Sequence, residues 1–365
     1  MQTRLTADLA HTRQGREADA ILRSCVHCGF CTATCPTYQL LGDERDGPRG
    51  RIYLIKQVME GATPTRETQL RLDRCLSCRA CETTCPSGVQ YGRLADIGRG
   101  HIEQHVDRPL SQQLIRRLLR LTVPYPRRIS ALIKAGRVLR PVLPARVKQN
   151  IPPIRSAGIW PTQQHARRML VLAGCVQSVV SPVTNQSTAL VLDRLGIQLI
   201  QAPGAGCCGA LNHHLSASQA AKKQMRQNID AWWSYIEEGI EAIIITASGC
   251  GTMVKDYGHL LQDDPVYADK ASTVSALAKD LIEVISPELL TRDWSQLGQN
   301  QTIAFQSPCS LQHGQQLAGQ VETLLQQLGF VLTPVSDSHL CCGSAGSYSL
   351  LQPELSGQLR QNKLQ

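Results

Sequence analysis

The chain has 365 residues, 42% of them hydrophobic and 4% aromatic, and a formal net charge of +9. This length predicts two or three domains, and the hydrophobic content excludes wholesale disorder. The fifteen cysteines do not suit a small secreted, disulfide-bonded protein, because the polar start shows no signal-like apolar region. No apolar run reaches the roughly 18 residues of a membrane span. We therefore expect a reducing compartment, where cysteines serve as metal ligands or redox thiols.

Eight cysteines before residue 90 form two copies of C-x2-C-x2-C-x3-C-P, namely CVHCGFCTATCP and CLSCRACETTCP. This is the spacing of bacterial two-cluster ferredoxins, in which the fourth cysteine ligates the other cluster. We therefore expect two [4Fe–4S] clusters in a mostly helical, ferredoxin-like domain over residues 1–105. The expected ligands are Cys25, Cys28, Cys31 and Cys85 for the first cluster, and Cys75, Cys78, Cys81 and Cys35 for the second. A pair of zinc sites is the alternative, although zinc ribbons use separated CxxC pairs.

The residues around these motifs favour an electron relay over a catalytic site. A proline follows each fourth cysteine and is expected to begin a helix. Arg49 and Arg51 lie between the motifs, where they can meet cluster charge or a partner, or face solvent. His27 is expected on the surface of its ligand loop. Residues 1–100 offer no nucleophile paired with a base and no open metal position, so we expect no catalytic residue there.

A basic, proline-interrupted segment follows over residues 106–166. From Arg108 to Arg168 there are fourteen Lys and Arg residues, among them Arg146, and no Asp or Glu, so the rest of the chain sums to −5. Leucines and isoleucines are interleaved with the basic residues, and the prolines limit the segment to short helices. We expect contact with an anionic membrane surface, docking to an acidic partner, or a solvated linker. Nucleic acid is not expected, because aromatic interleaving is missing.

The seven remaining cysteines belong to two similar units, residues 167–295 and 296–365. Each unit reads as a strand, a cysteine, a helix, a second strand and a CCG motif. Cys309 follows Cys175, and Cys341 follows Cys207, by the same 134 residues, which indicates an internal repeat. Alternating strands and helices predict parallel sheets. The expected fold class is therefore α+β overall, with a helical N-terminal domain and C-terminal α/β repeats.

The cysteines of the repeats are expected at one edge of each sheet. In the first repeat a third strand-like run, EAIIITASGC, ends at Cys250. The carboxyl ends of neighbouring parallel strands collect ligands, so these thiols can converge on an additional iron–sulfur or other metal centre. Met253 stands three residues further on, where a thioether ligand and core packing are alternatives. The additional candidates are Cys175, Cys207, Cys208, Cys250, Cys309, Cys341 and Cys342.

The second repeat stops before its copy is complete. The counterpart of Cys250 would lie 134 residues further on, near position 384, whereas the sequence has 365 residues. We therefore expect that the second repeat lacks its third strand and last cysteine, either through truncation or as a naturally shortened variant.

Together these features resemble the cysteine-rich-domain family, which includes heterodisulfide reductase subunits, the anaerobic glycerol-3-phosphate dehydrogenase small subunit and a lactate-utilisation protein. The likeness spans essentially the whole chain and is closest to the iron–sulfur subunits of bacterial glycolate oxidases. It rests on CVHCGFCTATCPTYQLLGDERDGPRGRIYLIKQV, CETTCPSGV, NIDAWW, TASGCG and DSHLCCGSAG. The repeats of heterodisulfide reductase hold five cysteines each, whereas four and three occur here, so the resemblance leaves a metal in the repeats undecided.

The resemblance implies an electron-transfer subunit of a glycolate oxidase complex. A partner subunit that carries FAD would oxidise glycolate to glyoxylate, and this chain would pass the electrons to a quinone-type acceptor. The alternatives are a heterodisulfide-reductase-like protein, an iron–sulfur subunit of a lactate or glycerol-3-phosphate dehydrogenase, and a zinc-bound scaffold protein. The expected location is the cytoplasm, with peripheral contact at the cytoplasmic face of the inner membrane through residues 108–168.

Overall fold

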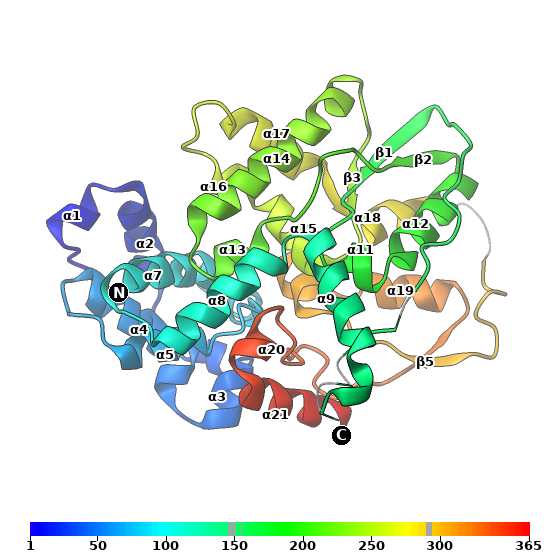
Figure 1. Ribbon diagram of the computed structural model, residues 1–365. Helices are drawn as coiled ribbons and strands as arrows, with labels where there is room; N and C mark the ends of the chain where they lie inside the picture. Colours follow the sequence, from blue (N-terminus) through cyan, green and yellow to red (C-terminus); the bar gives the residue numbers. More distant parts are fainter. Residues whose placement is uncertain (145–147, 149–150, 154, 290–293) are drawn as a thin grey trace. The chain divides into compact units, whose positions relative to one another are not determined.

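The computed structural model describes residues 1–144, 148, 151–153, 155–289 and 294–365 (Figure 1). The chain forms two compact units, one of residues 1–113 with 298–365 and one of residues 114–297. The boundary between them falls within helix α8 (Leu110–Thr122). Arg146 and the other members of the basic segment at 145–147, 149–150 and 154 lie outside the described residues.

The N-terminal part of the first unit consists of helices packed around one apolar core. Prolines at the first helical position begin α3 and α4, where the missing N–H costs no helical hydrogen bond. Gly98 of α7 lies against Ile55 of α4, and an added Cβ there would come within 2.7 Å of the isoleucine side chain. The elements are α1 (Ala7–Ala10), α2 (Arg13–Ser24), η1 (Phe30–Thr32), α3 (Pro36–Leu41), η2 (Glu44–Asp46), α4 (Pro48–Met59), α5 (Arg66–Asp73), α6 (Ala80–Thr83) and α7 (Tyr91–His105). The expected mostly helical domain is confirmed.

The C-terminal part of the first unit is a small α/β repeat. Its two strands pair in parallel, with Thr302 opposite Val331. Helix α19 connects them, as a parallel crossover requires. The elements are β5 (Thr302–Ala304), η4 (Ser310–Gly314), α19 (Gln320–Gln327), β6 (Val331–Thr333), α20 (Tyr348–Leu351) and α21 (Pro353–Leu364).

The second unit contains a four-stranded parallel sheet in the order β2-β1-β3-β4. Both faces of the sheet are apolar, as is usual for parallel sheets covered by helices. Leu170 and Ile243 face a core shared with α14, whereas Met169 and Ile244 face a core shared with α12. The strands are β1 (Arg167–Val171), β2 (Ile197–Ile200), β3 (Ile243–Ile245) and β4 (Ala278–Asp280). Parallel sheets, as predicted, occur in both units.

Helices make up most of the remainder of the second unit. The 20-residue helix α14 buries Trp232 completely in the core, which its apolar spacing allows. These elements are α9 (Pro126–Val138), η3 (Arg140–Val142), α11 (Gln177–Val180), α12 (Val183–Arg194), α13 (Ala210–His214), α14 (Ser218–Glu237), α15 (Ser248–Lys255), α16 (Tyr257–Leu260), α17 (Ala268–Leu277) and α18 (Leu281–Leu289). Within the described ranges, no helix combines the length and apolarity that crossing a bilayer requires.

The strands keep the periodicity of the cysteines. Strand β6 begins at Val331, 134 residues after β2 begins at Ile197, and β5 lies within the interval that the same offset assigns to β1. The internal repeat predicted from the cysteine spacing is therefore present in the structure as well.

Candidate metal centres

The two four-cysteine motifs line two cavities in the first unit, each enclosing about 420 Å³ of space that is partly open to solvent. The first cavity is lined by Cys25, Cys28, Cys31 and Cys85, together with Cys81. The second is lined by Cys35, Cys75, Cys78 and Cys81. Each cavity thus gathers three cysteines of one motif and the fourth of the other. The structure brings both expected ligand sets together, while ligation itself stays a prediction.

The two ligand loops have the same backbone geometry. The residues two and four positions after the first cysteine have positive φ in both, at His27 and Gly29 in one loop and at Ser77 and Arg79 in the other. Left-handed residues reverse the chain twice within a few residues, so successive thiols turn toward one point. Only one of the four positions is a glycine, and therefore three carry the strain of this conformation.

The fourth cysteines are held differently. Cys35 is the N-cap of α3, and Pro36 is the first helical residue, as predicted. Cys85 is also followed by a proline, but Pro86 begins a turn and the next helix starts only at Tyr91. The expectation of a helix after Cys85 was therefore wrong. A proline favours a first helical turn only where the residues after it can continue the helix, and here Ser87 and Gly88 follow.

The lining of the cavities suits a sulfur-ligated cluster. Among the residues that line them in the described structure, none is Asp or Glu, so the donors are the thiols, together with the His27 imidazole at the first cavity. Thiols select soft metals. Burial raises the pKa of Cys31 to about 11 and places those of Cys78 and Cys81 well above the usual range. Several thiolates can share such a pocket only with a compensating cation. The cavities therefore fit a metal cluster.

Tyr91 gives a second indication of a bound group. Its side chain lines both cavities and is 4% exposed. The hydroxyl is buried, and the Cys75 sulfur is the group beside it in the described structure that can share its hydrogen bond. A buried hydroxyl with only a weak partner is costly, and a cluster sulfur atom would accept its hydrogen bond.

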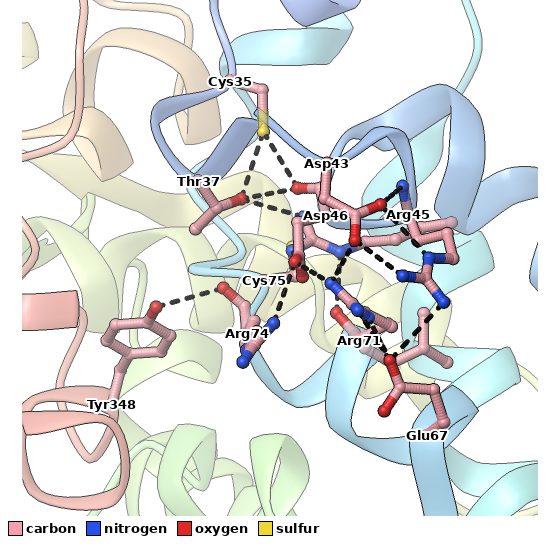
Figure 2. Close-up of polar contacts among 12 residues, drawn as sticks. Cys35, Thr37, Asp43, Arg45, Asp46, Glu67, Arg71, Arg74, Cys75 and Tyr348 are labelled. Carbon is pink, nitrogen blue, oxygen red and sulfur yellow. Dashed lines mark hydrogen bonds and ion pairs between the residues drawn. The ribbon is translucent and has the colours of Figure 1, made fainter. Parts of the chain in front are cut away.

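A buried ion-pair network lies beside the second cavity (Figure 2). The carboxylate of Asp46 is fully buried and pairs with Arg51 at 3.5 Å, with Arg74 at 2.9 Å and with Arg71. The main-chain oxygen of Asp46 accepts a hydrogen bond from Thr37 at 2.8 Å. Arg51 is 1% exposed, so the solvent-facing alternative considered for it was wrong. Sequence reasoning missed Asp46, because an acidic residue in a turn is usually solvated.

The first repeat gathers its four cysteines at one edge of the sheet in the second unit. Hydrogen bonds connect Cys175 to Cys207, Cys207 to Cys208, and Cys208 to Cys250. The hydrogen bond to Cys207 and burial raise the pKa of Cys175. Cys250 lies in the first turn of α15 and not at the end of β3, which stops at Ile245. The predicted strand was thus too long, because Ala-Ser-Gly ends the apolar run and begins a helix.

A buried asparagine and tyrosine hold the CCG loop of this repeat. Asn228 donates to the Cys207 carbonyl at 2.9 Å and accepts from the Gly206 N–H at 2.8 Å. The Tyr257 hydroxyl donates to the Cys208 carbonyl at 2.8 Å. These residues were missed, although Arg-Gln-Asn recurs at 360–362 with the 134-residue offset. Met253 is 4% exposed in the core, which agrees with the packing alternative.

The second repeat places its cysteines against the dicluster part of the first unit. The sulfur atoms of Cys309 and Cys341 lie 3.7 Å apart. Cys341 is buried in a small apolar cluster with Leu76, and Cys78 and Cys309 pack against the same cluster. The Tyr348 hydroxyl donates to the Arg74 carbonyl at 3.1 Å. The second repeat thus contacts the ligand loop that contains Cys75 and Cys78.

The basic segment presents apolar and basic side chains together. Neither α8 nor α9 has a fully buried residue. Leu114 is 58% exposed, Leu118 51% and Leu132 58%. Arg108 is an exception, because it is buried and paired with Asp73 at 2.5 Å. In the described part of the segment, apolar and basic side chains therefore form an exposed surface together.

Comparisons with known proteins agree with these sites. A family profile described as 4Fe-4S dicluster domain matches residues 21–89, and one described as cysteine-rich domain matches residues 169–255 and 303–365. The fold and the cysteine sites thus define an iron–sulfur protein that joins a dicluster domain to two cysteine-rich repeats.

Comparison with individual relatives identifies the family within this class of iron–sulfur proteins. The chain is 56% identical over 365 residues to the glycolate oxidase iron-sulfur subunit of Escherichia coli, covering 100% of this chain and 89% of that protein. It is 30% identical over 376 residues to the probable glycolate oxidase iron-sulfur subunit of Bacillus subtilis, covering 94% and 83%. Lactate utilization protein A of Bacillus subtilis is 26% identical over 52% of this chain. The chain belongs to the family of glycolate oxidase iron–sulfur subunits, and its role is electron transfer.

Proposed function

We propose that this chain transfers electrons within a complex that oxidises glycolate to glyoxylate. A flavin-containing partner subunit, which carries FAD, holds the substrate, and a quinone-type molecule accepts the electrons. The observation that supports this proposal most strongly is the pair of cavities that combine the cysteines of the two motifs crosswise. The 56% identity to a glycolate oxidase iron-sulfur subunit supports the choice of substrate.

In this proposal Cys25, Cys28, Cys31 and Cys85 hold one [4Fe–4S] cluster, and Cys75, Cys78, Cys81 and Cys35 hold the other. Such clusters supply one-electron transfer when bound. The protein contributes thiolate ligands, and Tyr91 lines both cavities. Cys28 is exposed, and its neighbours Val26 and Phe30 are 67% and 61% exposed. This loop is therefore the surface at which a redox partner can approach.

The cysteines of the repeats form an additional thiol site in the same proposal. The four linked thiols of the first repeat, from Cys175 to Cys250, are the larger set and suit an iron–sulfur or other metal centre. The second set is Cys309, Cys341 and Cys342, of which Cys309 and Cys341 lie beside the loop of Cys78.

Residues 108–168 attach the complex peripherally to an anionic membrane in this proposal. The segment has no acidic residue, and exposed leucines on α8 and α9 accompany its arginines. Apolar burial in the headgroup region and attraction to anionic lipids then act together. Co-sedimentation with vesicles should require anionic lipid and weaken with salt; equal binding to neutral vesicles would contradict this attachment.

Anaerobic co-purification with the partner subunits tests the electron-transfer role. Low-temperature electron paramagnetic resonance of the reduced complex should show two interacting [4Fe–4S] signals, and iron should greatly exceed zinc. The variant Cys28→Ser should abolish reduction of the acceptor by glycolate while the partner flavin is still reduced. Zinc without iron, or loss of flavin reduction in an assembled Cys28→Ser complex, would contradict the role.

A further inference from the structure

The two cysteine cavities differ in the charges around them. The charged side chains that line the second cavity are Arg51 and Arg79, and Arg49 is the arginine that lines the first. The Arg51 side chain is 1% exposed, whereas that of Arg49 is 36% exposed. A charge excluded from water acts on its surroundings more strongly than one that water screens. The charge of Arg51 is therefore placed to act strongly at the second cavity, and that of Arg49 to act weakly at the first.

Arg51 reaches the second cavity through a short chain of contacts. Its Nη1 donates to the Thr37 hydroxyl at 3.1 Å, and that hydroxyl lies 3.3 Å from the sulfur of Cys35. Its Nε donates to the Arg71 carbonyl at 2.8 Å, which fixes the direction of the guanidinium. Arg51 therefore holds a full positive charge close to a cysteine of the second cavity.

Arg99 acts on the same cavity from helix α7. Its Nη2 donates to the Cys75 carbonyl at 2.7 Å, and its Nη1 donates to the Ser77 hydroxyl at 2.8 Å. The side chain is 12% exposed. Both contacts are to the ligand loop itself, so this guanidinium is fixed against the loop that supplies three of the four thiols.

Nearby carboxylates compensate these charges only in part. Asp46 is shared among Arg51, Arg71 and Arg74, although Arg71 also pairs with Asp43 and Glu67. The Asp96 carboxylate lies 3.9 Å from Arg99. At the first cavity, by contrast, Arg49 has its own carboxylate partner, Glu44, at 2.6 Å in an exposed pair. Beside the second cavity, Arg51 shares its carboxylate and Arg99 lies 3.9 Å from its own, whereas beside the first cavity Glu44 largely cancels the charge of Arg49.

We propose that Arg51 and Arg99 raise the reduction potential of the cluster in the second cavity above that of the cluster in the first. Reduction adds negative charge to a bound cluster, so a buried positive charge favours the reduced form. Burial alone acts in the opposite direction, since it removes hydration from the more highly charged form, and the two arginines outweigh this effect. The inference rests on the proposed function for the presence of both clusters.

Redox titration of the purified full-length chain, followed by electron paramagnetic resonance, tests the proposal. Arg99→Gln should lower the higher of the two midpoint potentials by about 60 mV, a tenfold change in a one-electron equilibrium, and leave the lower one in place. Arg99→Lys keeps the charge and should shift that midpoint much less. Arg49→Gln is the matched control at the first cavity. It should change the equilibrium constant for reduction of the cluster with the lower midpoint potential by less than about twofold.

If the Arg99→Gln variant does not bind its clusters, a measurement on the unaltered chain still tests the proposal. Brief oxidation should first remove the cluster beside the exposed Cys28, and the cluster that survives should be the one with the higher midpoint. The proposal would be overturned if the surviving cluster had the lower midpoint potential. It would also be overturned if Arg99→Gln shifted only the lower midpoint potential, or neither of the two. Failure of the unaltered chain to bind two clusters would instead overturn the proposed function.

Discussion

The two cysteine cavities of the first unit have the same motif, the same positive-φ positions and the same crossed arrangement of thiols, yet their surroundings differ. One is bordered by a loop whose Cys28 and Phe30 are exposed. The other is enclosed by Arg51, Arg99 and the Asp46 network. The difference teaches that cysteine spacing determines which thiols meet, whereas residues between the motifs determine the electrostatics of the site.

Magnitudes show why burial matters more than the number of arginines. A unit charge about 8 Å from a cluster interacts with one added electron by about 2 kcal/mol at an effective dielectric constant of about 20. In bulk water the same interaction energy is only about 0.5 kcal/mol. An exposed arginine paired with a carboxylate loses most of even that smaller effect. We therefore expect substitutions at the buried arginines of the second cavity to have larger effects than equivalent substitutions at the exposed Arg49 of the first.

The largest expected effect is that of Asp46→Ala. Removing this buried carboxylate leaves Arg51, Arg71 and Arg74 without their shared partner, so the free energy of unfolding should fall by about 3–5 kcal/mol. Urea denaturation of the purified chain measures this loss. The matched control is Glu44→Ala, which breaks the exposed pair with Arg49 and should cost less than about 1 kcal/mol. Equal losses in the two variants would contradict the distinction between the cavities.

A smaller effect is expected from Tyr91→Phe, because this side chain lines both cavities. Without clusters the hydroxyl has only the Cys75 thiol, a weak hydrogen-bond partner, beside it in the described structure, so the variant should be about as stable as the parent chain. With clusters bound, loss of a hydrogen bond to sulfur should lower a midpoint potential and cost about 1 kcal/mol. Thermal unfolding with and without clusters tests this difference. A loss of stability in both forms would show that the hydroxyl has a stronger protein partner.

The smallest expected effect concerns pH. Burial and the neighbouring His105 lower the pKa of His101 below the usual value of 6.5. Above that value the histidine is neutral in both states; as the pH falls through 6.5 the unfolded chain takes up the proton first, so stability decreases. His101→Gln should therefore reduce the loss of thermal stability between pH 7.5 and pH 5.5. The exposed His11, replaced in the same way, is the control, and an equal effect there would contradict the assignment.

Much of the architecture could be predicted because it follows from spacing. The doubled motif predicts the crossed sets of thiols, and the 134-residue offset between Cys175 and Cys309 predicts two copies of a strand–helix–strand unit. The structure contains both strand pairs in parallel, and both family profiles cover the corresponding residues. Cysteine spacing is sufficient for these features, because each motif and each repeat keeps its own spacing wherever it lies in the sequence.

The parts that could not be predicted depend on contacts between distant residues. Asp46 and Arg51 resemble ordinary surface residues in sequence. The ion pairs of Asp46 with Arg71 and Arg74, and the hydrogen bond from Arg51 to the Arg71 carbonyl, bring in residues 20 or more positions away and make this burial favourable. Asn228 of helix α14 likewise acts on the loop residue Cys207, 21 positions away in the sequence. The place of Cys250 in a helix and not in a strand was missed because the apolar run that forms β3 was extended through Ala-Ser-Gly to the cysteine.

The crossed assignment of ligands is the central claim, and comparison of three single substitutions tests it most directly. Electron paramagnetic resonance of the reduced, purified chain should show that Cys85→Ser alters the same cluster signal as Cys28→Ser. Cys75→Ser should alter the other signal, although Cys75 and Cys85 belong to the same motif. If Cys85→Ser instead altered the signal that Cys75→Ser alters, each motif would hold its own cluster, and the account given for both cavities would be wrong.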